Sequence, residues 1–189
     1  MSDLRSRIFS HRKDFNDSGL DREALNSNPI TQFEAWLAEA LDLGVAEPYA
    51  FNLSTIAVDG FPTARIVYLR EVLDEGLVFY TNYSSAKGEE IRADGRASYT
   101  FFWNELHRQV RVKGRLQKVA TDRSDRYFAS RPRASQLGAW ASQQSSPLES
   151  REALQTRLQI LESEYSGKVI PRPPHWGGYM LIPTEWEFW

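Results

Sequence analysis

Residues 49–72 have the sequence YAFNLSTIAVDGFPTARIVYLREV, and this stretch decides the fold class. Two runs rich in β-branched and aromatic residues, 49–58 and 63–72, flank the dipeptide Asp59-Gly60. An Asp-Gly pair between two such runs is a strong signal for a tight β-hairpin. We therefore expect two antiparallel strands joined by this turn.

Further strand-like runs follow along the chain, at residues 77–83, 97–103, 109–119 and 179–182. Within 109–119, the apolar Val110, Val112 and Leu116 alternate with charged or polar residues, which predicts a strand with one face in water. Five or six strands in sequence, with helices at the flanks, predict a mainly β fold of the α+β kind. An antiparallel barrel or sheet fits this order better than a doubly wound fold.

Four helices are expected, each with its own start signal. The clearest is Asn28-Pro29, because asparagine is a favoured N-cap and proline suits the first helical position; this helix should end at Gly44. The other start signals are Ser84 or Ser85 before a helix through Ile91, Thr121 before a helix ending near Arg131-Pro132, and the capping box of residues 146–149 before a helix ending at Gly167.

The N-terminal residues 1–27 are polar, and we expect a loosely ordered arm with a basic stretch at His11-Arg12-Lys13. Residues 28–189 show no internal boundary and are predicted to form a single domain. The N-terminus has no apolar segment typical of a signal peptide, and no run approaches the roughly 20 apolar residues of a membrane span. We expect a cytoplasmic protein that does not bind a membrane.

Composition excludes several kinds of chemistry. The 23 Lys and Arg against 25 Asp and Glu give a net charge of −2, which argues against a dedicated nucleic-acid binder. The absence of cysteine excludes disulfides, thiolate nucleophiles and cysteine zinc sites. No His-x-x-x-His pair, glycine-rich phosphate loop or Gly-x-Ser-x-Gly motif occurs. No metal site is expected, and an enzyme of this composition would depend on a bound cofactor.

Arginines occupy unusual positions in the second hairpin strand. Arg65 shares strand parity with Val67 and Leu69, whereas Arg70 has the opposite parity. An arginine on an apolar strand face needs an anion or a carboxylate, because an unpaired buried charge is costly. Alternatively, each arginine lies at a strand end and extends its charge into water.

Two polar clusters could each bind a phosphate. In residues 80–87, hydroxyl groups, a predicted helix start and Lys87 follow one another. In residues 127–135, Tyr127 and Arg131 share a predicted helix face, with Ser135 nearby. Each cluster could equally be a solvated turn. Together with the aromatic content, the two clusters suggest a planar phosphorylated cofactor beside a phosphorylated substrate.

The same residues resemble a known family. The resemblance is carried by RIVYLR at 65–70, FYTN at 79–82, YFASRPRASQLGAW at 127–140, SQQSS at 142–146, WGG at 176–178 and EFW at 187–189. These segments are similar to those of the pyridoxine/pyridoxamine 5′-phosphate oxidases. The resemblance runs from about Arg12 to the last residue, and the block from Ser-Arg-Pro-Arg to Gln-Ser-Ser, residues 130–146, is highly specific.

This resemblance implies an antiparallel FMN-binding split β-barrel that works as a homodimer with flavin sites at the interface. It implies oxidation of pyridoxamine or pyridoxine 5′-phosphate to pyridoxal 5′-phosphate, with O2 as acceptor and H2O2 as product. FMN would carry the hydride transfer, with no catalytic side chain in this chain. The implied FMN-binding residues are Arg65, Ile66, Val67, Tyr68, Leu69, Arg70, Tyr80, Thr81, Lys87, Gln109, Gln144, Ser145 and Trp189. The implied substrate-binding residues are Arg70, Tyr127, Arg131 and Ser135.

Three features depart from the family pattern. Arg70 stands where the family often has lysine, and Ala86 where many members have arginine. The family continues past Glu-Phe-Trp with an Arg-Leu-His-Asp-Arg segment that reaches substrate and flavin, and this sequence stops at Trp189. We therefore expect the domain to lack that segment. Two alternatives remain: a non-catalytic module that binds FMN or pyridoxal phosphate, and a related flavin oxidoreductase with another substrate, such as a phenazine precursor.

Overall fold

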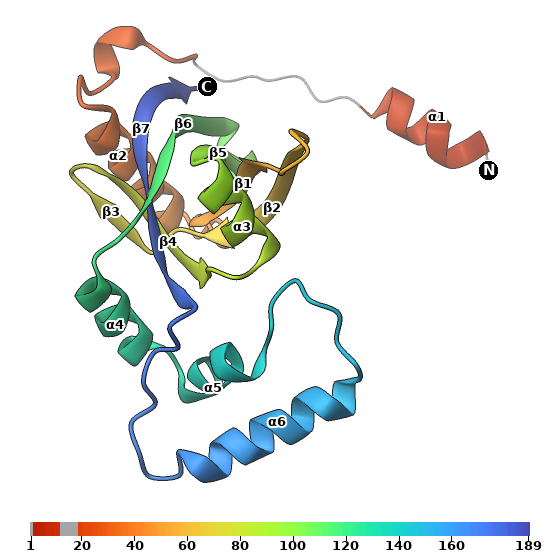
Figure 1. Cartoon of the computed structure of the whole chain (residues 1–189). Coiled ribbons are helices and arrows are strands. Elements are labelled where there is room, and N and C mark those ends of the chain that lie inside the picture. Colours follow the sequence, from red (N-terminus) through yellow and green to blue (C-terminus); the bar gives the residue numbers. More distant parts are fainter. Residues whose placement is uncertain (1, 12–18) are drawn as a thin grey trace.

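A computed structural model describes residues 2–11 and 19–189 and shows a seven-stranded antiparallel sheet that curls into a half-barrel (Figure 1). The strand order is β2-β1-β5-β6-β7-β4-β3. The strands are β1 (Ala50–Ile56), β2 (Pro62–Tyr68), β3 (Glu71–Leu73), β4 (Gly76–Asn82), β5 (Arg96–Trp103), β6 (Arg108–Lys118) and β7 (Trp176–Phe188). The predicted mainly β, antiparallel fold is confirmed.

The helices lie before, between and after these strands. They are α1 (Ser2–Ser10), α2 (Pro29–Asp42), α3 (Ala86–Ala93), α4 (Thr121–Ser130), α5 (Arg133–Ala141) and α6 (Arg151–Glu164), with short 3-10 turns η1 (Arg22–Ala24) and η2 (Asn104–Leu106). Within the region expected to be a loosely ordered arm, α1 and η1 are therefore helical. Of the basic stretch at its centre, Arg12 and Lys13 lie outside the described residues.

The hairpin of residues 49–72 forms as predicted in its first part only. Ala50 lies opposite Tyr68 and Ile56 opposite Pro62, and Gly60 takes the positive φ of 85° that this turn requires. The second run then divides. After Tyr68 the chain leaves β1, and β3 pairs with β4 at the other edge of the sheet, so one predicted strand becomes two.

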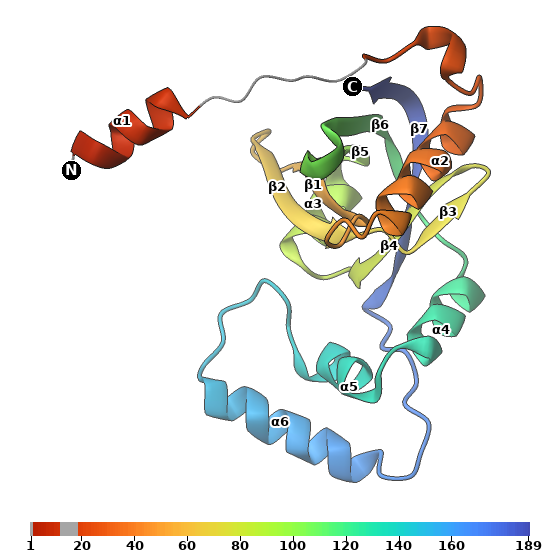
Figure 2. The ribbon, with the colours of Figure 1, turned by 180° about the vertical axis from the view of Figure 1, so that it is seen from behind.

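The main core lies inside the curl of the sheet, and α2 covers its open side (Figure 2). Asn28 caps α2 as predicted, accepting hydrogen bonds from the N–H groups of Ile30 and Thr31. The ring of Phe33 on this helix lies 4.8 Å from that of Phe101 on β5. Aromatic pairs at such distances add to the hydrophobic stabilisation of a core.

A second, smaller apolar cluster lies beyond the ends of β4 and β7, where α4, α5 and α6 gather (Figures 1 and 2). Its buried residues are Phe128, Leu137, Ile170 and Trp176. Trp176 is the first residue of β7, whereas Tyr179 and Leu181 of the same strand belong to the main core. Strand β7 therefore connects the two clusters.

Three predictions for this helical region are wrong. Thr121 is the first helical residue of α4 rather than its cap, because Ala120 occupies the cap position. The capping box at 146–149 does not form; Ser150 caps α6 instead and accepts from the N–H of Ala153. Helix α5 was not expected, since Arg-Pro-Arg suggested a turn.

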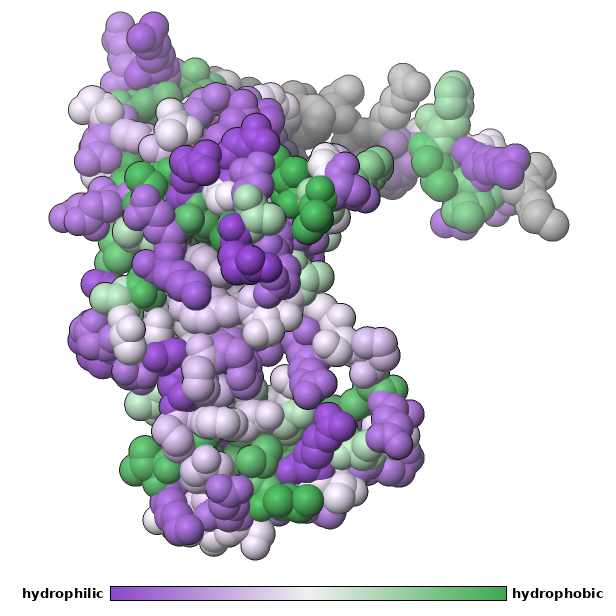
Figure 3. All heavy atoms as spheres, in the orientation of Figure 1, coloured by the Kyte–Doolittle hydropathy of each residue, from purple (hydrophilic) through white to green (hydrophobic). Residues whose placement is uncertain are grey.

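The surface in Figure 3 mixes polar and apolar side chains, and apolar ones gather on α1. Leu4, Ile8 and Phe9 of this helix are exposed. In the described part of the chain, no helix combines the length and the apolar character needed to cross a membrane.

Candidate functional site

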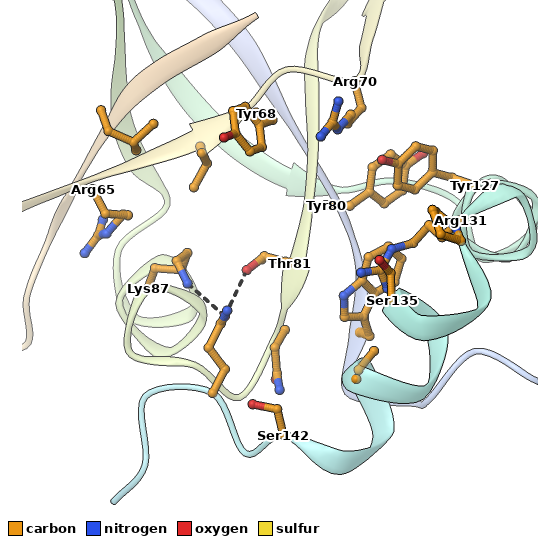
Figure 4. A pocket seen from close by; sticks show the side chains of 18 of the residues that line it. Arg65, Tyr68, Arg70, Tyr80, Thr81, Lys87, Tyr127, Arg131, Ser135 and Ser142 are labelled. Carbon is orange, nitrogen blue, oxygen red and sulfur yellow. Dashed lines mark hydrogen bonds between the residues drawn. The ribbon is translucent and has the colours of Figure 1, made fainter. Parts of the chain in front are cut away.

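A pocket of ≈ 920 Å³ lies between the sheet and the helices that surround the second apolar cluster. Strands β2 and β4 and helix α3 supply one side, and α4, α5 and the start of β7 supply the other (Figure 4). Most of the predicted site residues line it: Arg65, Ile66, Val67, Tyr68, Arg70, Tyr80, Thr81, Lys87, Gln144, Tyr127, Arg131 and Ser135. Both predicted phosphate clusters therefore open into the same space.

Lys87 lies at one end of this pocket, in the first turn of α3. Ser85 caps the helix, as predicted, by accepting from the N–H of Gly88. The Lys87 ammonium donates to Gln144 Oε1 at 2.9 Å and to Ser85 Oγ at 3.2 Å, although only 9% of the residue is exposed. Burial and then the nearby Arg65 charge lower the pKa of Lys87, and Glu90 partly offsets them. This cation has no carboxylate in direct contact in the described structure, so it is available to an anion.

Arg65 lies beside Lys87 but is already ion-paired. Its Nη2 donates to Glu90 Oε2 and to Thr63 Oγ1, both at 2.8 Å. Its Nη1 donates to the hydroxyl of Thr55. The expectation that an arginine with this parity needs a carboxylate is therefore confirmed for Arg65, and the partner comes from α3.

Arg131 lies at the opposite end of the pocket, across from Lys87 (Figure 4). Its guanidinium lies 4.5 Å from the centre of the Trp176 ring, and its Nη1 is buried without a hydrogen-bond partner among the described residues. Burial lowers the pKa of Arg131, an effect that Tyr127 partly offsets and Arg70 reinforces. A buried N–H without a partner is costly, so this nitrogen is suited to bind an anionic ligand.

Three parallel aromatic rings form a wall at the Arg131 end. The Tyr80 and Tyr127 rings are 3.9 Å apart at 11°, and the Tyr80 and Trp176 rings are 5.5 Å apart at 9°. Burial and the hydrogen bond to Glu71 raise the pKa of Tyr80, so its hydroxyl stays protonated. Tyr80, which the family resemblance places beside the flavin, therefore lies at the Arg131 end of this pocket.

Four predicted flavin residues do not line the pocket. Leu69 is buried in the main core, and Ser145 follows Gln144 with a positive φ of 68°. Gln109 and Trp189 pair with each other through two backbone hydrogen bonds, of 2.7 and 2.9 Å. Their roles toward flavin remain predictions.

Several lining residues were not predicted as site residues, although the family motifs contain them. They are Asn82, Ser130, Pro132, Gly138, Ala139, Ser142 and Trp176. The signal that could have found them is position, because each lies in a quoted segment and all but Trp176 are near a predicted site residue. Glu90 and Thr55 lie outside these segments and gave no such signal.

The donor groups of the pocket fit a phosphorylated flavin together with a second anion. Cationic groups lie at both ends, one with an unpartnered buried N–H, and the apolar Ile66 and Val67 line the pocket together with hydroxyl and amide groups. Among residues 2–11 and 19–189, no group of three or more His, Asp or Glu could hold a metal ion.

The fold and this site define an antiparallel split barrel with a pocket that is cationic at both ends. A family model described as pyridoxamine 5′-phosphate oxidase matches residues 37–163. A pyridoxine/pyridoxamine 5′-phosphate oxidase of Cyanothece sp. is 49% identical over 182 residues, which cover 96% of this chain and 85% of that protein. The corresponding enzyme of Rubrobacter xylanophilus is 49% identical over 185 residues, 98% of this chain and 85% of that protein. The chain belongs to the pyridoxamine 5′-phosphate oxidase family.

Solved structures agree with this assignment. PhzG from Burkholderia lata 383, in complex with tetrahydrophenazine-1-carboxylic acid, matches with a TM-score of 0.86 at 33% identity, covering 93% of this chain and 87% of that one. A pyridoxamine 5′-phosphate oxidase-related, FMN-binding protein from Nostoc punctiforme matches with a TM-score of 0.66 at 19% identity, covering 82% and 83%. The second likeness concerns the fold alone.

Proposed function

We propose that this protein is an FMN-dependent oxidase that converts pyridoxamine or pyridoxine 5′-phosphate to pyridoxal 5′-phosphate. The observation that carries the proposal is the pair of cationic ends within one pocket, because it offers separate sites for a cofactor phosphate and a substrate phosphate. The family and the names of the relatives support the same reaction.

Each end has a defined task in this proposal. Lys87 and Arg65 bind the FMN phosphate, and Gln144 and Thr81 add polar contacts beside them. Arg131 binds the substrate phosphate, with the hydroxyl groups of its neighbours Tyr127 and Ser135 and the Arg70 charge. FMN, when bound, would supply the redox chemistry that links oxidation of the substrate to reduction of O2. The chain contributes by orienting the two ligands and by excluding water.

A second copy of the chain completes the site in this proposal. Ile66 lines the pocket although it is 65% exposed, so apolar surface remains there for a flavin ring or a partner subunit. The expected residues outside this pocket, Gln109 and Trp189, would reach a flavin across such an interface. Sedimentation of the FMN-loaded protein should give a dimer, and a monomer with full FMN affinity would exclude this part of the proposal.

The test of the function combines binding and turnover. Purified protein supplied with FMN should become yellow, and anaerobic addition of pyridoxamine 5′-phosphate should bleach the flavin absorbance. In air, pyridoxal 5′-phosphate and H2O2 should form in equal amounts. Protein that takes up no FMN would contradict the proposal. Flavin binding without peroxide formation would instead indicate the non-catalytic binding module.

The PhzG structure supports a second candidate, oxidation of a phenazine precursor. The ligand in that structure is a carboxylic acid and carries no phosphate, so the two candidates differ in the anion that Arg131 would receive. Turnover should be compared for pyridoxamine 5′-phosphate, pyridoxamine and a reduced phenazine carboxylic acid. Preference for the phosphorylated amine supports the first candidate, and preference for the phenazine supports the second.

A further inference from the structure

Glu90 is a buried carboxylate that has no task in the function proposed above. It lies in α3, it is 9% exposed, and it does not line the pocket. It is nevertheless close to both cations of the flavin-phosphate end. Arg65 is its ion-pair partner, and Lys87 precedes it by one turn of the same helix, a spacing that places the two side chains on one helix face.

Three donors converge on a single oxygen of this carboxylate. Glu90 Oε2 accepts from Thr55 Oγ1 at 2.5 Å, from Thr63 Oγ1 at 2.8 Å and from Arg65 Nη2 at 2.8 Å. Thr55 and Thr63 are directly opposite each other in the β1–β2 pairing, so the carboxylate connects α3 to both strands of the hairpin. This network fixes the Arg65 guanidinium through its Nη1 and Nη2 atoms.

The carboxylate is ionised at neutral pH. Burial alone would raise the pKa of Glu90, but hydrogen bonds from Thr55, Thr63 and Arg65 outweigh burial and place the pKa below its ordinary value. The same charge raises the pKa of Lys87, against burial and Arg65. Glu90 thus favours the protonated form of Lys87 and fixes the orientation of the Arg65 side chain.

Arg65 still has a donor for a ligand. Its hydrogen bonds to the described residues use Nη1 and Nη2, and the Nε–H remains on a side chain that lines the pocket. An arginine held in one rotamer loses little further entropy when an anion binds. The negative charge of Glu90 opposes the anion, so its benefit must come from this preorganisation.

We propose that Glu90 is a positioning residue for the flavin phosphate, which it serves by holding the Arg65 guanidinium in a binding orientation next to Lys87. The inference rests on the proposed function, because it assigns FMN to this end of the pocket. It predicts that Glu90 contributes to the recognition of the phosphate and not of the flavin ring.

Riboflavin, which has the ring but no phosphate, separates these two contributions. The dissociation constants of FMN and riboflavin can be measured for the full chain by quenching of flavin fluorescence. In Glu90→Ala, FMN affinity should fall about tenfold, the effect of losing one charge-assisted contact, while riboflavin affinity stays unchanged. Glu90→Gln, which keeps an acceptor oxygen, should restore most of the FMN preference.

Glu89→Ala is the matched control, because Glu89 is the preceding residue of α3, is exposed and pairs with Arg92. It should leave both affinities unchanged. If Glu90→Ala does not fold, Glu90→Asp withdraws the carboxylate by one methylene and should lower the FMN preference in the same direction.

Three results would overturn the inference. An FMN preference that stays unchanged in Glu90→Ala, whether or not both affinities fall, would show at most a structural role, and an increased FMN preference would show that the carboxylate only repels phosphate. Either result leaves the proposed function intact if the wild type prefers FMN. A wild type that binds both flavins equally would overturn the phosphate end itself, and the proposed function with it.

Discussion

Arg131 lies at the end of the pocket that the proposed function assigns to the substrate phosphate. Its Nη1 has no partner among the described residues, and its guanidinium lies against the Trp176 ring. Arg131→Ala should therefore weaken pyridoxamine 5′-phosphate binding by roughly 1.5–3 kcal/mol, or about 10- to 100-fold in KM, because a charge-assisted contact is lost. FMN affinity should not change. Steady-state kinetics and flavin titration measure the two effects.

A substitution of Arg65 is the counterpart of Arg131→Ala at the other end of the pocket. Arg65→Ala should release FMN, because it removes a cation from the flavin-phosphate end. If Arg65→Ala and Arg131→Ala released FMN equally, the division of the pocket into two phosphate sites would be incorrect.

Strand parity indicated that Arg65 either needs an anionic partner or extends its charge into water; it could not choose between these or name the partner. Glu90 lies 25 residues after Arg65 in the chain, and its other partner Thr55 lies 35 residues before Glu90. Such contacts depend on how α3 lies against the hairpin, and local sequence patterns do not contain that information. The resemblance to a family supplied the pocket-lining positions that parity alone left open.

At the scale of elements, prediction succeeded where a signal was local and had no competitor. Asn28-Pro29 and Asp59-Gly60 each occupy the positions that they predicted. The predicted start of α6 was wrong because Ser146 and Ser150 are both acceptable caps, and the helix uses Ser150. Helix α5 follows Pro132, whose local sequence equally suits a turn.

Two helical glycines give a test of how α3 and α5 are placed. A Cβ on Gly88 would lie 2.0 Å from the Tyr83 carbonyl oxygen, whereas a Cβ on Gly138 would meet nothing within 4 Å. Gly88→Ala should destabilise the ligand-free protein by about 1–3 kcal/mol, because the backbone before α3 must move. Gly138→Ala should stabilise it by up to about 1 kcal/mol through helix propensity. Urea unfolding measures both, and a stable Gly88→Ala protein would contradict the placement of α3.

In the whole molecule, the main core and the second apolar cluster are expected to unfold together. The pocket lies between them, and β7 contributes residues to both. A ligand that contacts both sides then stabilises the entire fold, since ligand binding favours the folded state by mass action. One cooperative transition is therefore expected in thermal unfolding.

Thermal unfolding with FMN tests this coupling together with the two-ended pocket. FMN at 100 times its dissociation constant should add about 2.7 kcal/mol, which corresponds to a rise in Tm of roughly 5–10 °C for a domain of this size. The full rise should persist in Arg131→Ala, because that variant keeps the flavin end intact, and it should disappear in Arg65→Ala. Far-UV circular dichroism follows the loss of secondary structure in the sheet and in the helices together. Two separate transitions, of which FMN shifts only one, would show that the helical cluster folds independently of the barrel.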